Sequence, residues 1–240
     1  MKPFESRGHR GRDYQHCYRQ IIIMSTSITF VLFFLMSCQP LLKKNDNTSS
    51  HDITEVQIGD QVWMSRNFDG TTFRNGDSIP HAKSTEEWVK AGKAAKPAWC
   101  YYENDTSIGR KYGGIYNWYA VNDPRGFCPK GWHVPTNDEW IILENFLGSS
   151  EAGLRLKCDA GWTKNGNGNN SSKFCALAGG YRGKEGGFSG VEEFTYLSSS
   201  TERDHKENDI WGRGIHYADS TIMRCGLYKE HGLYVRLIRD

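Results

Sequence analysis

The cysteines are the residues of this sequence whose spacing most directly limits the available chemistry. The chain has seven, and two of them, Cys17 and Cys38, lie near its N-terminus. No pair has the Cys-x-x-Cys spacing of a zinc site or a thiol-redox site. In an oxidising compartment such cysteines form disulfides. The other five are odd in number, so at least one stays a thiol or pairs with another molecule: Cys100, Cys128, Cys158, Cys175 and Cys225.

Three Asn-Asp pairs are the candidate ligands for a hard cation such as calcium. They are Asn104-Asp105, Asn122-Asp123 and Asn208-Asp209. Asn and Asp side chains also bond their own backbone in turns and helix caps, and we favour this second role. The sequence therefore predicts no metal site, and nothing in it indicates a cofactor.

Candidate catalytic groups are scattered along the chain. His133 is either a ligand or base, or a hydrogen-bonded residue at a junction between a strand and a helix, and we favour the second role. Glu192, Glu193 and Glu202 are carboxylates of the kind a glycosidase uses, but the sequence does not set their separation. No Gly-x-Ser-x-Gly nucleophile elbow accompanies the histidines. We therefore predict no catalytic residue, and keep an enzyme as an alternative.

Aromatic side chains give the clearest indication of a binding surface. They make up 13% of the sequence. Between Gly179 and Trp211 they stand among many Gly and Ser residues, which places flat apolar rings on adaptable backbone, as in loops that bind a sugar or a partner protein. The alternative is that most of these rings belong to the core. The predicted ligand-binding residues are Tyr181, Arg182, Tyr196 and Trp211.

The N-terminal segment predicts where the protein lies. Four arginines precede the uncharged run Ile21–Ser37, an arrangement typical of a secretory signal peptide. The sequence Leu35-Met36-Ser37-Cys38 resembles the bacterial lipobox, which implies cleavage before Cys38 and lipidation of that cysteine. An uncleaved single-pass anchor is the alternative, and the run is slightly short for it.

We therefore divide the chain into a signal peptide (1–37), a polar lipid-anchored tether (38–52) and one domain (53–240). The lipid would connect the protein to a membrane from outside the cytoplasm, at the bacterial outer membrane or the cell surface. A formal net charge of +2 provides no basic footprint, so nucleic acid is excluded as a partner.

Local patterns predict the elements that must position these residues. Apolar and polar residues alternate at 55–58 and 61–64 around Gly59-Asp60, which predicts a hairpin. Capping boxes beginning at Ser84 and Thr136 predict two helices. The second helix is expected to turn three side chains to the core: Trp140, Leu143 and Leu147.

Later strands are expected at three places. Short apolar runs predict strands at 174–177 and 194–198. The runs Ile215–Cys225 and Leu233–Ile238 are expected to form a hairpin around Lys229–Gly232. The opening hairpin and the closing strand both alternate, so they are expected to lie side by side.

Several ordered motifs resemble one known family. They are Tyr112–Val121, Cys128–Thr136, Ala178–Arg182, Ser198–Glu202 and Val235–Asp240. They make the region from Val56 to Asp240 similar to the Fibrobacter succinogenes major paralogous domain, which occurs mostly in secreted proteins and lipoproteins. The resemblance implies an α+β, C-type-lectin-like fold with short twisted antiparallel sheets, about two to three helices and long loops. The family has no settled biochemical activity.

The resemblance bears on two candidate disulfides. Family members commonly have Cys in place of Leu237, with Cys128 as its expected partner. In this chain Cys225, on the preceding predicted strand, is the candidate to replace it. Cys158 and Cys175 flank a polar loop, and a disulfide between them would contribute ~3 kcal/mol. Unpaired cysteines that pack as small hydrophobes are the alternative.

These observations predict a lipid-anchored binding or adhesion protein whose ligand is a glycan or an envelope protein. The alternatives are an enzyme acting on extracellular polysaccharide or peptide, and a surface structural protein with no specific ligand. The fold implied by the resemblance is shared with calcium-dependent sugar binders, but their Glu-Pro-Asn and Gln-Pro-Asp motifs do not occur here. Binding is therefore expected to survive a strong chelator.

Overall fold

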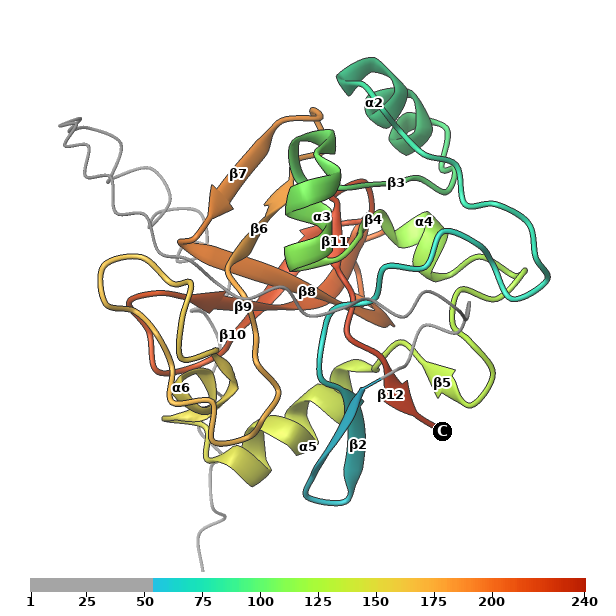
Figure 1. The fold of residues 1–240 in the computed structure, drawn as a ribbon. Coiled ribbons are helices and arrows are strands. Elements are labelled where there is room, and N and C mark those ends of the chain that lie inside the picture. Colours follow the sequence, from blue (N-terminus) through green and yellow to red (C-terminus); the bar gives the residue numbers. More distant parts are fainter. Residues whose placement is uncertain (1–53) are drawn as a thin grey trace, which may run out of the picture. The chain divides into compact units, whose positions relative to one another are not determined.

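Two β-sheets organise residues 54–240, the part of the chain that the computed structural model describes (Figure 1). The predicted signal peptide (1–37) and tether (38–52), with Cys38, lie outside the described residues. The described part is an α+β fold, as the sequence predicts, and strands and loops predominate over helices. None of the helices within it is both long enough and apolar enough to cross a membrane.

The smaller sheet brings the two ends of the domain together. Its four strands lie in the order β1-β2-β12-β5, with the respective bounds Glu55–Ile58, Gln61–Met64, Ile238–Arg239 and Trp132–His133. Gly59 turns the β1–β2 hairpin with a φ of 61°, which glycine adopts without strain. Ile238 of β12 pairs with Trp63 of β2. Both the opening hairpin and its pairing with the closing strand are confirmed.

The larger sheet has eight strands. Six of them follow the order β10-β9-β8-β11-β4-β3, while β6 pairs with β8 and β7 pairs with β6. The strand predicted at 194–198 is confirmed and continues to Glu202. The bounds are β3 Trp99–Cys100, β4 Ile115–Tyr116, β6 Gly179–Arg182, β7 Phe188–Val191, β8 Phe194–Glu202, β9 Asp209–His216, β10 Met223–Tyr228 and β11 Leu233–Tyr234.

The predicted C-terminal hairpin is wrong. Strand β10 pairs with β9, with Cys225 opposite Gly212, whereas β11 pairs with β4 and β8. The chain reverses between β9 and β10, where the amide of Asp219 donates to the carbonyl of His216 at 3.2 Å. The run 215–225, which the sequence predicts as one strand, therefore contains the turn of a different hairpin.

The two predicted helices begin at their predicted caps. Helix α2 (Thr85–Lys93) begins after Ser84, whose side chain accepts from the Glu87 amide. Helix α5 (Asn137–Leu147) has a complete capping box, in which Thr136 and Glu139 each satisfy a backbone amide of the other. These hydrogen bonds supply partners to amides that have none within the helix.

The number of helices is larger than the two to three predicted. The described residues contain five α-helices and one short 3-10 helix. The additional helices have seven residues or fewer, which is too short for an apolar periodicity to mark them. Two of them do have polar caps, Asp105 and Asn117. The additional elements are η1 Tyr102–Asn104, α3 Thr106–Tyr112, α4 Trp118–Val121 and α6 Ala152–Leu156.

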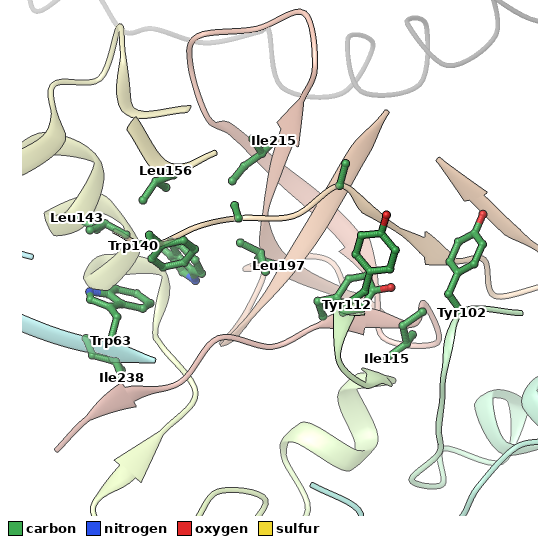
Figure 2. Close-up of a cluster of buried hydrophobic side chains, with 14 of the residues drawn as sticks. Trp63, Tyr102, Tyr112, Ile115, Trp140, Leu143, Leu156, Leu197, Ile215 and Ile238 are labelled. Atoms are coloured by element: carbon green, nitrogen blue, oxygen red, sulfur yellow. The ribbon is translucent and has the colours of Figure 1, made fainter. Parts of the chain in front are cut away.

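Helix α5 packs its predicted face into the core (Figure 2). Trp140 and Leu143 are fully buried, and Leu147 is nearly so. The ring of Trp140 lies 4.8 Å from that of Trp63 on β2 and 6.1 Å from that of Phe174, measured between centroids. Three large rings thus join α5, the small sheet and the loop that precedes β6.

Candidate ligand-binding site

The predicted ligand-binding residues do not form one exposed surface. Tyr181 and Tyr196 contact each other edge to face, with centroids 5.3 Å apart. Tyr196 is only 5% exposed, whereas Tyr181 is half-buried. Trp211 points to the opposite face of the sheet, because Tyr196 pairs with Gly214, three residues farther along β9, and side chains alternate along a strand.

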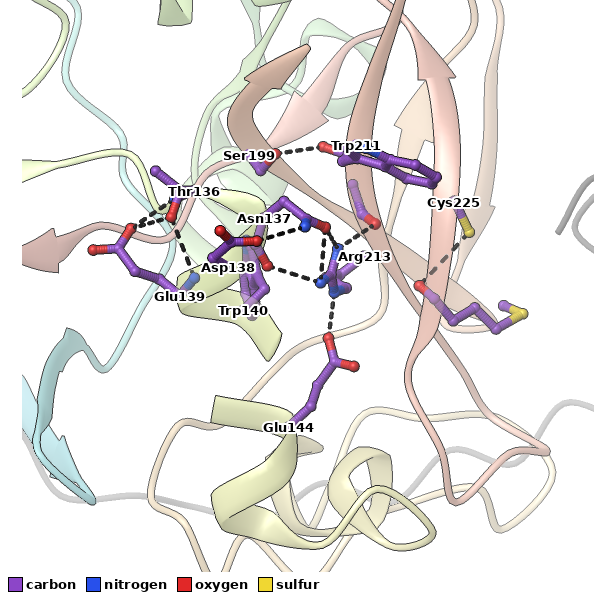
Figure 3. Close-up of polar contacts among 12 residues, drawn as sticks. Thr136, Asn137, Asp138, Glu139, Trp140, Glu144, Ser199, Trp211, Arg213 and Cys225 are labelled. Atoms are coloured by element: carbon purple, nitrogen blue, oxygen red, sulfur yellow. Dashed lines mark hydrogen bonds and ion pairs between the residues drawn. The ribbon is translucent and has the colours of Figure 1, made fainter. Parts of the chain in front are cut away.

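Trp211 lies between two arginines. The guanidinium carbons of Arg224 and Arg203 lie 3.7 Å and 4.8 Å from its ring centroid, and the ring is half-buried. On the same face of β9, Arg213 is fully buried and donates to Glu144 and Asn137 of α5 (Figure 3). Contact of Trp211 with a ligand stays a prediction, and its arginine neighbours give it a packing role as well.

Arg182 has a structural position rather than a ligand-facing one. Its side chain is fully buried, with the guanidinium carbon 4.7 Å from the ring centroid of Trp88. It donates to the carbonyls of Ala82 at 3.1 Å and Ser84 at 2.9 Å. Arg182 therefore fixes the backbone that leads into α2.

That backbone borders the candidate site, a hollow beside helix α2. The hollow has a volume of about 350 Å³. Its floor is apolar, with Ala82 and Ala98 buried and Ala91 half-buried. We call it the α2 hollow, lined by Pro80, His81, Ala82, Glu87, Lys90, Ala91, Ala94, Lys96, Pro97 and Ala98.

His81, one of the residues that line the α2 hollow, is part of an aromatic stack with Trp99. The ring of His81 lies parallel to that of Trp99, with centroids 4.4 Å apart and an interplanar angle of 17°. Trp99 is fixed by a hydrogen bond from its Nε1 to the carbonyl of Ile79 at 3.0 Å. Burial and the positive charge of Lys83 lower the pKa of His81, so its ring is neutral at pH 7. A neutral, flat ring on a fixed support is an apolar contact surface.

Charged groups surround the apolar floor. Lys90 and Lys96 are exposed on the rim of the hollow, as is Glu87. The carboxylate of Glu87 accepts from the amide of Lys83 at 2.6 Å, which fixes its position beside the start of α2. An apolar floor with a few polar groups around it is the usual arrangement of a small-ligand site.

No local sequence pattern identifies the α2 hollow. The lining residues come from α2 and from the segments on either side of it, and most of them are Ala and Pro, which have no chemical signature of their own. The available signal is the pair of prolines at 80 and 97, which bracket the helix predicted to begin after Ser84.

Comparison with known families identifies the domain. The model of the Fibrobacter succinogenes major domain matches residues 56–239. The chain belongs to this family. The match runs from β1 to β12 and confirms the resemblance seen in the sequence. No curated protein and no solved structure matches the chain, and a C-type-lectin-like form of the fold stays a prediction.

His133, which lies in one of the family motifs, is held between two carboxylates. Its Nδ1 lies 2.8 Å from Asp240 Oδ1, and its Nε2 lies 2.8 Å from Glu139 Oε1. Burial lowers the pKa of His133, but these two carboxylates outweigh it and the pKa is raised. Nearby, burial raises the pKa of the Cys128 thiol to about 12, so it is not an activated nucleophile at pH 7. The hydrogen bonding expected of His133 is confirmed, and its role stays a prediction.

One of the two candidate disulfides is confirmed. Cys158 and Cys175 are bonded, across a sequence separation of 17. Next to the disulfide, Ala176 makes only an isolated bridge with Lys157. The strand predicted at 174–177 is therefore wrong. The disulfide and this isolated bridge connect the segment to the rest of the domain instead.

The pairing of Cys128 with Cys225 is wrong. Both are buried cysteines outside any disulfide in the described residues. The prediction rested on the C-terminal hairpin, which would have placed Cys225 beside Leu237. Because β10 pairs with β9 instead, Cys225 belongs to the edge strand of the large sheet, whereas Cys128 precedes β5 of the small sheet.

The Asn-Asp pairs serve as caps and turn residues where the structure defines their role. Asp105 accepts from two amides in the first turn of α3, Asn122 is the C-cap of α4, and Asp123 forms an ion pair with Arg125 at 2.8 Å. Within residues 54–240 there is no group of three or more His, Cys, Asp or Glu side chains that could hold a metal ion.

Proposed function

We propose that this family member is a lipid-anchored binding protein outside the cytoplasm, and that the α2 hollow binds a glycan. The observation that carries the proposal is the His81–Trp99 stack beside an apolar floor with charged groups on its rim. A pyranose ring has an apolar face of C–H groups and an edge of hydroxyls. The stack and floor suit the face, and Glu87, Lys90 and Lys96 suit the hydroxyls.

The size of the hollow is consistent with this ligand class. At about 350 Å³ it lies at the lower end of the range of roughly 300–1,000 Å³ usual for small-molecule sites. The backbone along one side of the hollow is also held in place, because Arg182 donates to the carbonyls of Ala82 and Ser84. A site whose backbone is already fixed loses less conformational freedom when a ligand binds.

Glycan binding is tested with the full-length protein in detergent, first on a glycan array and then by titration with the best ligand. Ala94 is exposed and lines the hollow, so Ala94→Trp should fill the space and abolish binding. Ala218→Trp, at an exposed site on the β9–β10 turn, should not. Loss of the stacking face in His81→Ala should weaken binding about threefold to tenfold, and a strong chelator should have no effect.

The opposite pattern would contradict the assignment of the site. If Trp211→Ala abolishes binding and Ala94→Trp leaves it intact, the ligand lies on the surface around Trp211. If no glycan binds, the proposal of glycan binding is wrong.

The lipid anchor is proposed from the lipobox-like sequence at Leu35–Cys38. Expressed in a bacterium, the full-length protein should incorporate labelled palmitate and partition into detergent. Cys38→Ala should abolish both, because it removes the sulfur that accepts the lipid, whereas Cys17→Ala, inside the predicted signal peptide, should abolish neither. Labelling that persists in Cys38→Ala would show that this cysteine is not the anchor.

A further inference from the structure

The α2 hollow continues on the other side of the helix. A second hollow of about 510 Å³ is lined by Glu86, Val89, Lys90, Lys93 and Ala94. Lys90 and Ala94 line both hollows. The second is an open, shallow depression, and the two meet over the C-terminal half of α2.

Charges are segregated along this surface. Glu86 and Glu87 lie in the first turn of α2, where Glu87 is bonded to the amide of Lys83 and a hydrogen bond from Ser84 lowers the pKa of Glu86. Lysines occupy the other end, and all three are exposed: Lys90, Lys93 and Lys96. None of the three takes part in an ion pair between described residues.

Stabilisation of the helix accounts for only part of this arrangement. Lys90 and Lys93 lie in the last turn of α2, where positive charge interacts favourably with the helix dipole. Lys96 lies beyond the helix, whose C-cap is Ala94. The helix dipole therefore does not explain why Lys96 is on the rim of the hollow.

A buried side chain fixes the backbone of Lys96. Asn117 is 1% exposed, and its Nδ2 donates to the carbonyl of Lys96 at 2.8 Å. Its Oδ1 accepts from the amide of Ala98 at 3.0 Å. The amide of Lys96 in turn donates to Ala91 of α2 at 2.9 Å. The rim lysine and the floor alanine are thus held by one buried residue, and this places a cation beside an apolar surface.

We infer that the glycan taken by the α2 hollow is acidic, a polymer of sugars that carry carboxylates, and that Lys90, Lys93 and Lys96 bind those carboxylates. The inference rests on the proposed glycan binding and specifies its ligand class. Charge complementarity supports it: three lysines that form no ion pair between described residues line the two hollows, and of the two carboxylates that also line them, Glu87 is bonded to the amide of Lys83. Uronic acid rings have both the apolar face and the anionic group that this surface fits.

The test compares two forms of one polymer on the full-length protein in detergent. Polygalacturonate oligomers should bind, and the same oligomers with every carboxylate methyl-esterified should bind at least tenfold more weakly. Affinity for the acid form should fall as salt is raised, because exposed charge pairs are screened. The double variant Lys90→Gln/Lys96→Gln should lose on the order of tenfold in affinity for the acid form.

A matched control distinguishes the local effect of these lysines from the effect of the protein's overall charge. Lys173→Gln/Lys206→Gln removes the same charge at exposed sites far along the chain and should leave affinity unchanged. Equal binding of the acid and ester forms, or of a neutral glycan alone, would overturn the inference and leave the proposed glycan binding intact. Failure of every glycan to bind would overturn both. Equal losses in the two double variants would overturn the assignment to these lysines.

Discussion

Replacing Arg236 with methionine is expected to lower the free energy of unfolding by about 3–5 kcal/mol. Arg236 is 1% exposed. Its guanidinium donates to the carbonyls of Met64 and Phe174 and to Asn67 Oδ1. Methionine replaces the apolar stem of the side chain but supplies none of the donors, so these buried oxygens lose their partners.

The surroundings of Arg236 make it more costly to remove than a surface arginine. No carboxylate pairs with it among the described residues, and burial lowers its pKa to about 9, which leaves the guanidinium charged at pH 7. The guanidinium carbon of Arg236 lies 4.1 Å from the ring centroid of Phe174. One side chain thus joins the segment between β11 and β12 to β2 and to the segment next to the disulfide.

Urea unfolding followed by circular dichroism measures this effect. The control is Arg239→Met, three residues farther along. Arg239 is exposed and forms an ion pair with Glu55, so its loss should cost no more than about 1 kcal/mol. Equal, small losses in the two variants would show that the buried hydrogen bonds of Arg236 do not stabilise the fold.

Local hydrogen-bonding signals in the sequence predict part of this fold correctly. Thr136 with Glu139, and Gly59 in its hairpin, act within a few residues, so sequence spacing is sufficient to find them. Arg236 shows the opposite case. It stands in a predicted strand as an ordinary alternating residue, and its burial depends on Asn67 and Phe174, which are distant in sequence.

The candidate site was harder to predict for the same reason. The sequence predicts an exposed binding surface from the aromatic residues between 179 and 211, but partners on other elements decide their exposure. Arg182 is buried because α2 and its leading segment cover it. Conversely, Ala98 and Lys96 gain their place in the hollow through Asn117 of the α4 cap, a contact that no local pattern indicates.

The second large effect is expected at Trp140. Trp140→Ala should lower the free energy of unfolding by about 3–5 kcal/mol, because a large buried ring is replaced by a cavity. The ring is fully buried between Trp63 and Phe174, and its Nε1 donates to the carbonyl of Ser198 at 3.3 Å. The contacts with three separate segments leave little room for the structure to close the gap.

Two further variants of α5 distinguish core packing from helix formation. Thr136→Ala removes the cap and should cost about 0.5–2 kcal/mol. Ile142→Ala, on the same helix but 54% exposed, should stay within about 0.5 kcal/mol of the parent. If Trp140→Ala costs no more than Thr136→Ala in urea unfolding, then α5 stabilises the domain through its own hydrogen bonds and not by packing. The expected order, with Trp140 first and Ile142 last, instead makes α5 the element whose buried face ties the two sheets together.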